Sequence, residues 1–262
     1  MTETEAWQLN ADAAEVYERD FVPAIFGEWA ARVCDAAQVS SADSVLDVAC
    51  GTGVIAREAL RRGATATGVD INPGMLAVAG RVAPNAAFEL GDAAALPFPA
   101  NAFTKTLCQF AFMYLPDRVT AIQEMARVTA PGGTLAIAVW TSLEDAPGYQ
   151  LLADIAERAH QPAVAATMRA PFVLGEASLV RDLFGRAGVH LAGLRHTSGS
   201  VRFDSIDALV HAEIAGTPLA GTLGRDGYQA LLNEARVALA PFCTAGGVRF
   251  PIGAHIAISR KH

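Results

Sequence analysis

The segment Ser44–Gly53 has the sequence Ser-Val-Leu-Asp-Val-Ala-Cys-Gly-Thr-Gly. Its apolar residues predict a short strand, and its two glycines predict a tight turn that leads into a helix from Val54. Because glycine carries no Cβ atom, a ligand can come close to the backbone at such a turn. The first turn of the helix also offers unpaired N–H groups to an anionic or polar group. The segment therefore predicts a ligand-binding turn, with a tight turn that binds nothing as the alternative.

Asp47 indicates which ligand suits this turn. A carboxylate beside a phosphate-binding turn would repel the phosphate, so we expect a ligand that carries positive charge. S-adenosylmethionine (SAM), which has an ammonium and a sulfonium group, meets that requirement. The rival is a nicotinamide-dependent dehydrogenase, because residues 51–56 fit Gly-x-Gly-x-x-Gly/Ala and Asp70 follows Gly51 by nineteen residues. Asp47 argues against the dehydrogenase, since it would face the pyrophosphate.

Several motifs occur in the order and at the spacing found in one enzyme family. Val45–Gly53 resembles the first motif of class I SAM-dependent methyltransferases, an acidic residue followed by Gly-x-Gly. The likeness is closest to the small-molecule group typified by the ubiquinone and menaquinone biosynthesis methyltransferases, and it covers roughly residues 17–189. Leu96–Pro99 and Arg127–Gly133 resemble further motifs of that group. The chain departs from it at Phe103–Lys105, where the relatives place Phe-Asp; we expect this change to affect packing or strand solvation more than SAM binding.

Asp70 is the predicted ribose ligand. In a doubly wound sheet, ligands lie beyond the carboxyl ends of the strands, and Asp70 ends the predicted strand Thr65–Asp70. Its two oxygens can accept both hydroxyls of an adenosine ribose, which is also the role that the resemblance implies. Capping of the helix that starts after Asn72 is the alternative. If Asp70 binds the ribose, Ile71 and Met75 would flank the adenine with apolar and polarisable contacts.

The resemblance implies the remaining cofactor contacts. Asp92 resembles the acid that accepts a hydrogen bond from the adenine N6 amine, and Ala93 would offer backbone hydrogen bonds. A tyrosine placed like Tyr17 can reach the cofactor in this family, and Gln109 ends the fourth strand facing the site. The full set of predicted cofactor-binding residues is Tyr17, Asp47, Ala49, Gly51, Gly53, Asp70, Ile71, Met75, Asp92, Ala93 and Gln109.

The order of the segments predicts an α/β fold. Strands and helices alternate as far as Trp140, which indicates a doubly wound, mostly parallel sheet with helices on both faces. The resemblance implies seven strands, a Rossmann-like methyltransferase fold and an antiparallel last strand at Val248–Ser259. We expect one methyltransferase domain, residues 1–262, with an N-terminal helical lid at 1–38, whose second helix starts at Pro23, and a helical cap insertion at 204–245. These additions would form the acceptor pocket or, alternatively, a homodimer interface.

Composition excludes several classes of function. The net charge is −7 and the pI is near 5.3, so nucleic acid is not an expected partner. The four cysteines are scattered, the N-terminus lacks the features of a signal peptide, and no apolar run reaches the ~18 residues of a membrane span. We therefore expect a cytoplasmic protein without a membrane span. The sequence shows no metal-binding cluster.

The predicted reaction transfers a methyl group from SAM to a small, apolar or aromatic molecule. SAM carries a good leaving group, so a general base is needed only if the acceptor must lose a proton. His196 and His211 flank the cap and are the best base candidates, but a surface or core role is the expected one for each, and no catalytic residue is assigned. The alternatives are an NAD(P)-dependent dehydrogenase and a SAM-binding protein without catalysis.

Overall fold

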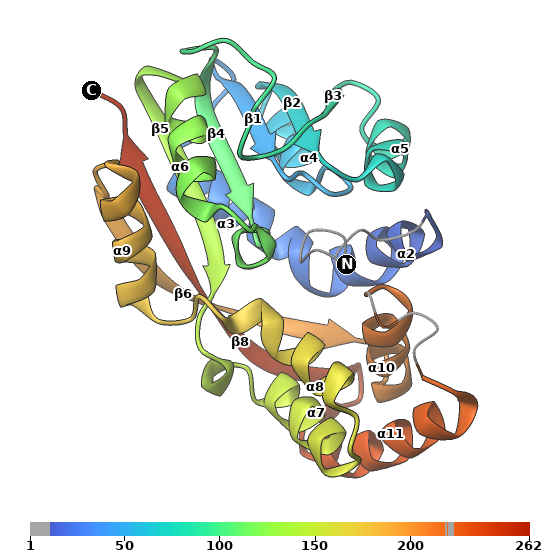
Figure 1. Ribbon diagram of the computed structural model, residues 1–262. Coiled ribbons are helices and arrows are strands. Elements are labelled where there is room, and N and C mark those ends of the chain that lie inside the picture. The colour runs from blue at the N-terminus through green and yellow to red at the C-terminus, as the bar shows by residue number, and fades with distance from the viewer. Residues whose placement is uncertain (1–10, 218, 220–222) are drawn as a thin grey trace.

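The computed structural model describes residues 11–217, 219 and 223–262, and its centre is one twisted sheet (Figure 1). The strand order is β3-β2-β1-β4-β5-β8-β6, with β7 paired to β8. All neighbours from β3 to β5 are parallel, whereas β8 runs antiparallel to both β5 and β6. The strands are β1 Ser44–Val48, β2 Thr65–Asp70, β3 Ala87–Leu90, β4 Phe103–Gln109, β5 Thr129–Trp140, β6 Gly193–Phe203, β7 Cys243–Thr244 and β8 Gly247–Arg260.

This architecture confirms the predicted fold, with differences at the strand ends. The sheet has eight strands rather than seven only because the two-residue β7 adds to β8. Residues 130–133, predicted as a turn, belong to β5 as an irregularity: Phe103 pairs with Thr129 but Lys105 pairs with Thr134. β6 begins at Gly193 and extends to Phe203, later than the predicted Val189–Ser198, because its whole length pairs with β8.

Helices cover both faces of the sheet. α3 Gly27–Ala36 packs against α4 Val54–Arg61 on one face, and α6 Arg118–Val128 packs against α9 Ala177–Ala187 on the other, while α5 Pro73–Val82 lies beside β2 and β3. Local sequence explains where these helices begin and end. The Asn72 side chain caps α5 by accepting from the N–H groups of Gly74 and Met75, and Asp117 caps α6, both as predicted.

A second group of helices lies below the carboxyl ends of the parallel strands (Figure 1). It consists of α7 Pro147–Arg158, α8 Pro162–Arg169, α10 Ile206–Ala215 and α11 Arg225–Ala238. Of these four helices, the predicted insertion at 204–245 contains α10 and α11. α7 comes from an earlier part of the chain and packs against α11, and α8 packs against α7. Four short 3₁₀ segments connect larger elements: η2 Phe112–Tyr114, η3 Leu143–Asp145, η4 Ala170–Phe172 and η5 Ala240–Phe242.

The N-terminal helices differ from the prediction. α2 Ala11–Val16 continues into a π-helix, η1 Tyr17–Phe26, and then into α3, so Pro23 lies inside a helix and does not start one. A proline lacks the N–H donor and crowds the carbonyl four residues earlier, which disfavours regular α-helix. The wider i→i+5 spacing of a π-helix accommodates that defect, and such segments are frequent at functional sites. The first helix of the predicted N-terminal lid is expected over residues 3–18. Its residues 3–10 lie outside the described residues.

In the described part of the chain, no single helix is both long and apolar enough to cross a membrane. One bent pair of helical segments, Pro162–Phe172 with Ala177–Ala187, reaches that length and composition only when the two are taken together.

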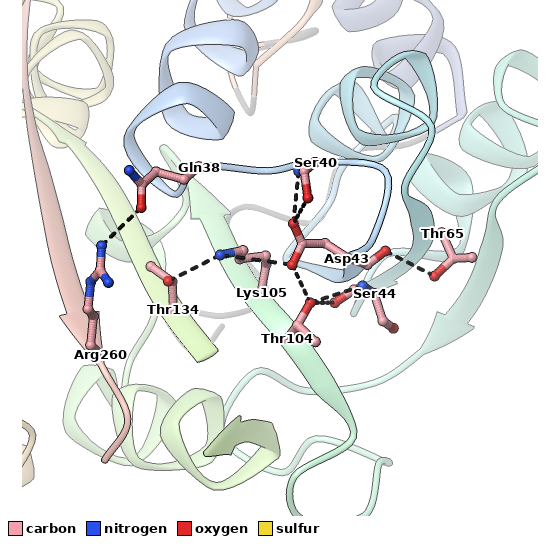
Figure 2. Close-up of polar contacts among 9 residues, drawn as sticks. All are labelled: Gln38, Ser40, Asp43, Ser44, Thr65, Thr104, Lys105, Thr134 and Arg260. Atoms are coloured by element: carbon pink, nitrogen blue, oxygen red, sulfur yellow. Dashed lines mark hydrogen bonds and ion pairs between the residues drawn. The ribbon is translucent and has the colours of Figure 1, made fainter. Parts of the chain in front are cut away.

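A polar cluster joins three strands at the end of the sheet where β1 begins (Figure 2). The Thr104 hydroxyl donates to Asp43 Oδ1 over 2.8 Å and accepts from the Ser44 backbone N–H over 3.0 Å. Lys105 Nζ lies 3.9 Å from the same carboxylate and 3.4 Å from the Thr134 hydroxyl. Burial would raise the pKa of Asp43, but hydrogen bonds from Thr104 and Ser40 hold it below its ordinary value. The Thr-Lys pair that departs from the family pattern thus supports the sheet at the edge away from the ligand-binding turn.

We expect Thr104→Val to lower the free energy of unfolding by about 1–3 kcal/mol, because Asp43 loses a donor to its charged carboxylate. Denaturant titration measures this loss. The matched control is Thr65→Val, since Thr65 is exposed and its hydroxyl reaches only the Asp43 carbonyl at 3.5 Å; its effect should stay within about 0.5 kcal/mol. Equal effects of the two substitutions would show that the Thr104–Asp43 contact contributes nothing specific.

Candidate functional site

A cavity of about 250 Å³ lies between the carboxyl ends of the parallel strands and the lower group of helices. Its strand side is formed by residues that follow β1, β2, β3 and β4. Nine of the eleven predicted cofactor-binding residues line it, namely Tyr17, Ala49, Gly51, Asp70, Ile71, Met75, Asp92, Ala93 and Gln109. Asp47 and Gly53 do not line it. The structure therefore brings most of the predicted set to one cavity, at the sheet edge where the topology places ligands.

The turn after β1 has an unusual backbone. Ala49, Gly51 and Gly53 all have positive φ angles, of 53°, 53° and 80°. A Cβ atom added at Gly51 would lie 3.9 Å from the Tyr17 ring, so this glycine leaves the backbone open to the cavity. A Cβ atom at Gly53 would lie 3.0 Å from the Phe88 ring, so this glycine permits close packing behind the turn. The two glycines of the motif are thus required for different structural reasons, the first for access to the cavity and the second for packing behind the turn.

Asp47 is buried behind the turn. Its Oδ2 atom accepts a hydrogen bond from the Ala56 N–H over 3.1 Å, which ties the end of β1 to the first turn of α4. Burial raises the pKa of this carboxyl well above its ordinary value. This hydrogen bond gives Asp47 a structural role, because it links the strand to the helix. That Asp47 favours a positively charged ligand stays a prediction. The carboxyl would have to act on the ligand from behind the cavity wall.

Asp70 faces the cavity with both oxygens already oriented. Oδ2 accepts from the Gly51 N–H and Oδ1 from the Asn72 N–H, each over 2.8 Å. Burial raises the pKa of this carboxyl, and the hydrogen bonds from Asn72 and Gly51 oppose that shift. Each carboxylate oxygen can accept more than one hydrogen bond, so two acceptor positions remain for a diol. The alternative role as a helix cap belongs instead to the Asn72 side chain.

Gln109 offers another acceptor beside the turn. Its Nε2 atom donates to the Phe26 carbonyl over 3.2 Å, while its buried Oε1 atom has no hydrogen-bond partner within the described residues. A buried acceptor without a partner is costly, so a ligand N–H or O–H at this position would be stabilising. The adjacent Phe110 has a φ angle of 53°, a strained conformation for a bulky residue on a cavity wall.

Aromatic rings form the middle of the cavity. Tyr17 stacks on Phe26 with ring centroids 4.9 Å apart, and Phe110 stacks on Trp140 at 3.4 Å. Trp29 meets the Phe110 and Trp140 rings edge-on behind this wall. The π-helix supplies Tyr17 and Phe26, which brings the N-terminal segment to the cavity wall. These rings create an apolar, water-poor space next to the polar strand ends.

Glu213 is a site residue that the sequence reasoning missed. It lies on α10, is only 7% exposed, and its Oε1 atom accepts a 2.6 Å hydrogen bond from the Tyr149 hydroxyl of α7. Both residues line the cavity at the end formed by the lower helices. Burial raises the pKa of Glu213 to about 7, although the bond from Tyr149 acts in the opposite direction. The signal was present: an acid at 213 shares helical spacing with the apolar Ile206, Leu209 and Val210.

The two histidines suggested as bases lie elsewhere. His211 is exposed on α10 and His196 is exposed on β6, where its ring lies 5.9 Å from that of His255. The cavity wall, as far as the structure describes it, includes three acids, Asp70, Asp92 and Glu213, and no lysine, arginine or histidine. The described residues also contain no group of three or more acids, histidines or cysteines that could hold a metal ion. The wall therefore disfavours anionic ligands.

Comparisons with known proteins agree with this geometry. The family described as "Methyltransferase domain" matches residues 46–137. A demethylmenaquinone methyltransferase of Beutenbergia cavernae is 32% identical over 176 residues, which cover 65% of this chain and 71% of that protein. The chain belongs to the class I SAM-dependent methyltransferases. The family model begins within β1 and ends within β5, so it contains the turn and the strand ends but not the lower helices.

Two further similarities concern another relative of this methyltransferase chain and a solved structure. An uncharacterized protein of Mycobacterium bovis is 31% identical over 180 residues, which cover 66% of this chain and 64% of that protein. The chain thus spans slightly less than two thirds of that relative's length. A phosphoethanolamine N-methyltransferase of Haemonchus contortus, solved with phosphomonomethylethanolamine and S-adenosylhomocysteine, has a TM-score of 0.61 at 17% identity, covering 97% of this chain and 58% of that one. At this identity the likeness concerns the fold alone.

The buried Glu213 gives a testable dependence of stability on pH. Its pKa rises from 4.5 to about 7 on folding, so between these values the unfolded chain loses the proton that the folded protein keeps. The free energy of unfolding therefore falls as pH rises through this window, by about 3 kcal/mol in all at about 1.4 kcal/mol per pKa unit.

Glu213→Gln should remove this contribution. The stability difference between the variant and the wild type should grow in favour of the variant by about 3 kcal/mol from about pH 4.5 to about pH 8. Urea unfolding at several pH values measures the difference. The contributions of the buried Asp47 and Asp70 to the pH dependence cancel, because both proteins contain these residues. A difference that stays constant with pH would place the Glu213 carboxyl in water.

Proposed function

We propose that the protein transfers a methyl group from SAM to a small, apolar or aromatic molecule. One observation carries the proposal: a single cavity joins the Gly51 turn and the Asp70 carboxylate to an aromatic space enclosed by helices. Family membership favours methyl transfer over the nicotinamide chemistry that the glycine spacing also allowed. The strand order with an antiparallel β8 also differs from the 3-2-1-4-5-6 order of dinucleotide-binding sheets.

The residues on the strand side fit the donor. Asp70 has the free acceptor positions for a ribose diol, Gly51 leaves room for close approach, and Gln109 Oε1 is a buried acceptor suited to an ammonium group. Asp92 lines the cavity, and one of its carboxyl oxygens accepts from the Ala94 N–H, which leaves acceptor capacity for an exocyclic amine. SAM, when bound, supplies an activated methyl group on a good leaving group.

The chain's own contribution is placement and the exclusion of water. Correct orientation of two reactants can lower a barrier by about 7–11 kcal/mol. We infer that residues 11–38 and the lower helices enclose the acceptor, because Tyr17, Phe26, Tyr149 and Phe172 contribute aromatic surface to the same cavity. This assignment extends the predicted cap to α7 and α8. A homodimer interface formed by these segments is the competing proposal.

Calorimetry with SAM, S-adenosylhomocysteine, NAD and NADP tests the donor. We expect both adenosyl ligands to bind and neither nicotinamide to do so. Transfer of label from methyl-tritiated SAM to apolar phenols and amines then separates an enzyme from a SAM-binding protein without catalysis. Tight binding of NAD(P) without SAM binding would reject the proposed function.

Asp70→Ala should weaken SAM binding by about 10²-fold, because two charge-assisted hydrogen bonds to the ribose are lost. The matched control is Asp43→Ala, which removes a poorly exposed carboxylate at the opposite end of the sheet that also accepts from a backbone N–H. The control should lower stability and leave the affinity for SAM unchanged. If the two variants bind SAM equally well, Asp70 is not a ligand.

A further inference from the structure

Glu213 and Tyr149 form a buried acid–hydroxyl pair on the cavity wall, at the end away from the Gly51 turn. The chain separates them by 64 residues, and their 2.6 Å hydrogen bond joins α10 to α7. Within the described residues the second carboxyl oxygen, Oε2, has no hydrogen-bond partner, and the cavity wall includes the residue. A buried carboxyl with one oxygen oriented and the other free is suited to receive a hydrogen bond from a ligand.

The pair and Asp70 come from opposite sides of the cavity. Asp70 ends β2 on the strand side, whereas Tyr149 lies on α7 and Glu213 on α10, in the lower group of helices. Tyr17 and Tyr114 line the same cavity. The proposed donor contacts are on the strand side, so Glu213 is on the side left for the acceptor.

We propose that Glu213 binds the hydroxyl of the methyl acceptor and takes its proton, and that the acceptor is a neutral, apolar molecule with an ionisable hydroxyl. The inference rests on the proposed function. The walls between the carboxyls are aromatic and no basic side chain of the described wall could pair with an anionic acceptor. A hydroxyl reaches this space uncharged, so it avoids the cost of burying an ion.

The step balances with Glu213 as the only base. The acceptor oxygen forms a bond to the methyl carbon as the carbon–sulfur bond breaks, and that electron pair stays on sulfur. The hydroxyl proton passes to Glu213, which becomes neutral and later returns the proton to solvent. A carboxyl with a pKa of about 7 is divided between both forms at neutral pH, which suits a general base.

Among the described residues, Tyr114 on η2 is the one further titratable group that interacts with this pair. The Glu213 charge acts on Tyr114, and burial raises the pKa of the Tyr149 and Tyr114 hydroxyls above the ordinary value. His211, on the same helix, is exposed and does not line the cavity. The structural alternative is that the Tyr149–Glu213 hydrogen bond only holds α7 to α10. In that case the protonation state of Glu213 would not change the affinity for a ligand.

Binding of naphthol to the protein saturated with S-adenosylhomocysteine separates these roles without relying on turnover. The ionised Glu213 accepts from the naphthol hydroxyl, so affinity should rise about tenfold or more from about pH 5.5 to about pH 8, with a midpoint near 7. Methoxynaphthalene, which has no donor, should show no such rise. Naphthoate, an anion, should bind more weakly than naphthol at about pH 8, because the described wall has three acids and no basic side chain.

Three variants test whether Glu213 causes the pH dependence. Glu213→Gln should abolish the rise, and with labelled SAM it should slow methylation of naphthol by about 10²-fold or more. Tyr149→Phe should move the midpoint to higher pH, because the Tyr149 bond lowers the pKa of Glu213. The control Glu144→Gln, an exposed acid outside the cavity, should leave affinity and midpoint unchanged.

The outcomes distinguish this inference from the proposed function. If S-adenosylhomocysteine does not bind, the proposed function fails and the inference fails with it. If it binds, but naphthol does not bind or binds equally well across this pH range, Glu213 is only a structural link. A pH-dependent rise that persists in Glu213→Gln, or tighter binding of naphthoate than of naphthol, also overturns the inference.

Discussion

The hydrogen bonds of the Asp70 carboxylate hold the site together. One oxygen accepts from the turn after β1 and the other from the start of α5, so a single side chain at the end of β2 fixes two neighbouring connections. With only 9% of its surface exposed, this carboxylate could not remain charged without such donors. The same bonds turn its remaining acceptor positions toward the cavity. Gly51, which donates one of these bonds, also has a positive φ angle, a conformation that glycine adopts readily.

The N-terminal segment closes the site through an irregular helix. Tyr17–Phe26 is a π-helix, and its wider turn carries Tyr17, Phe21, Ile25 and Phe26 to the cavity wall. Gly216, just after α10, has no room for a Cβ atom because the Phe21 ring is 2.8 Å away. The segment is thereby packed between the strand ends and the lower helices, and its aromatic rings line the cavity where the two meet.

Charge is distributed unevenly along the cavity. Asp70 and Asp92 lie on the side of the strands and Glu213 lies among the helices, with aromatic residues between them. A carboxyl in an apolar region keeps its proton to higher pH than one surrounded by backbone donors, and Glu213 and Asp70 show this difference in surroundings. Two acids of the same chemical type therefore have different surroundings on the two sides of one cavity.

Local sequence was sufficient for the strand–turn–helix elements and for most residues on the strand side of the cavity, because Ser44–Gly53, Asp70 and Asn72 act through contacts within one or two consecutive connections. It was insufficient for Pro23, whose π-helix depends on packing between the sheet and α10. It also could not show that Asp47 turns away from the cavity toward Ala56. The pairing of Tyr149 with Glu213 required the tertiary structure, since only folding brings α7 beside α10, and the burial that shifts the Glu213 pKa is a property of that contact.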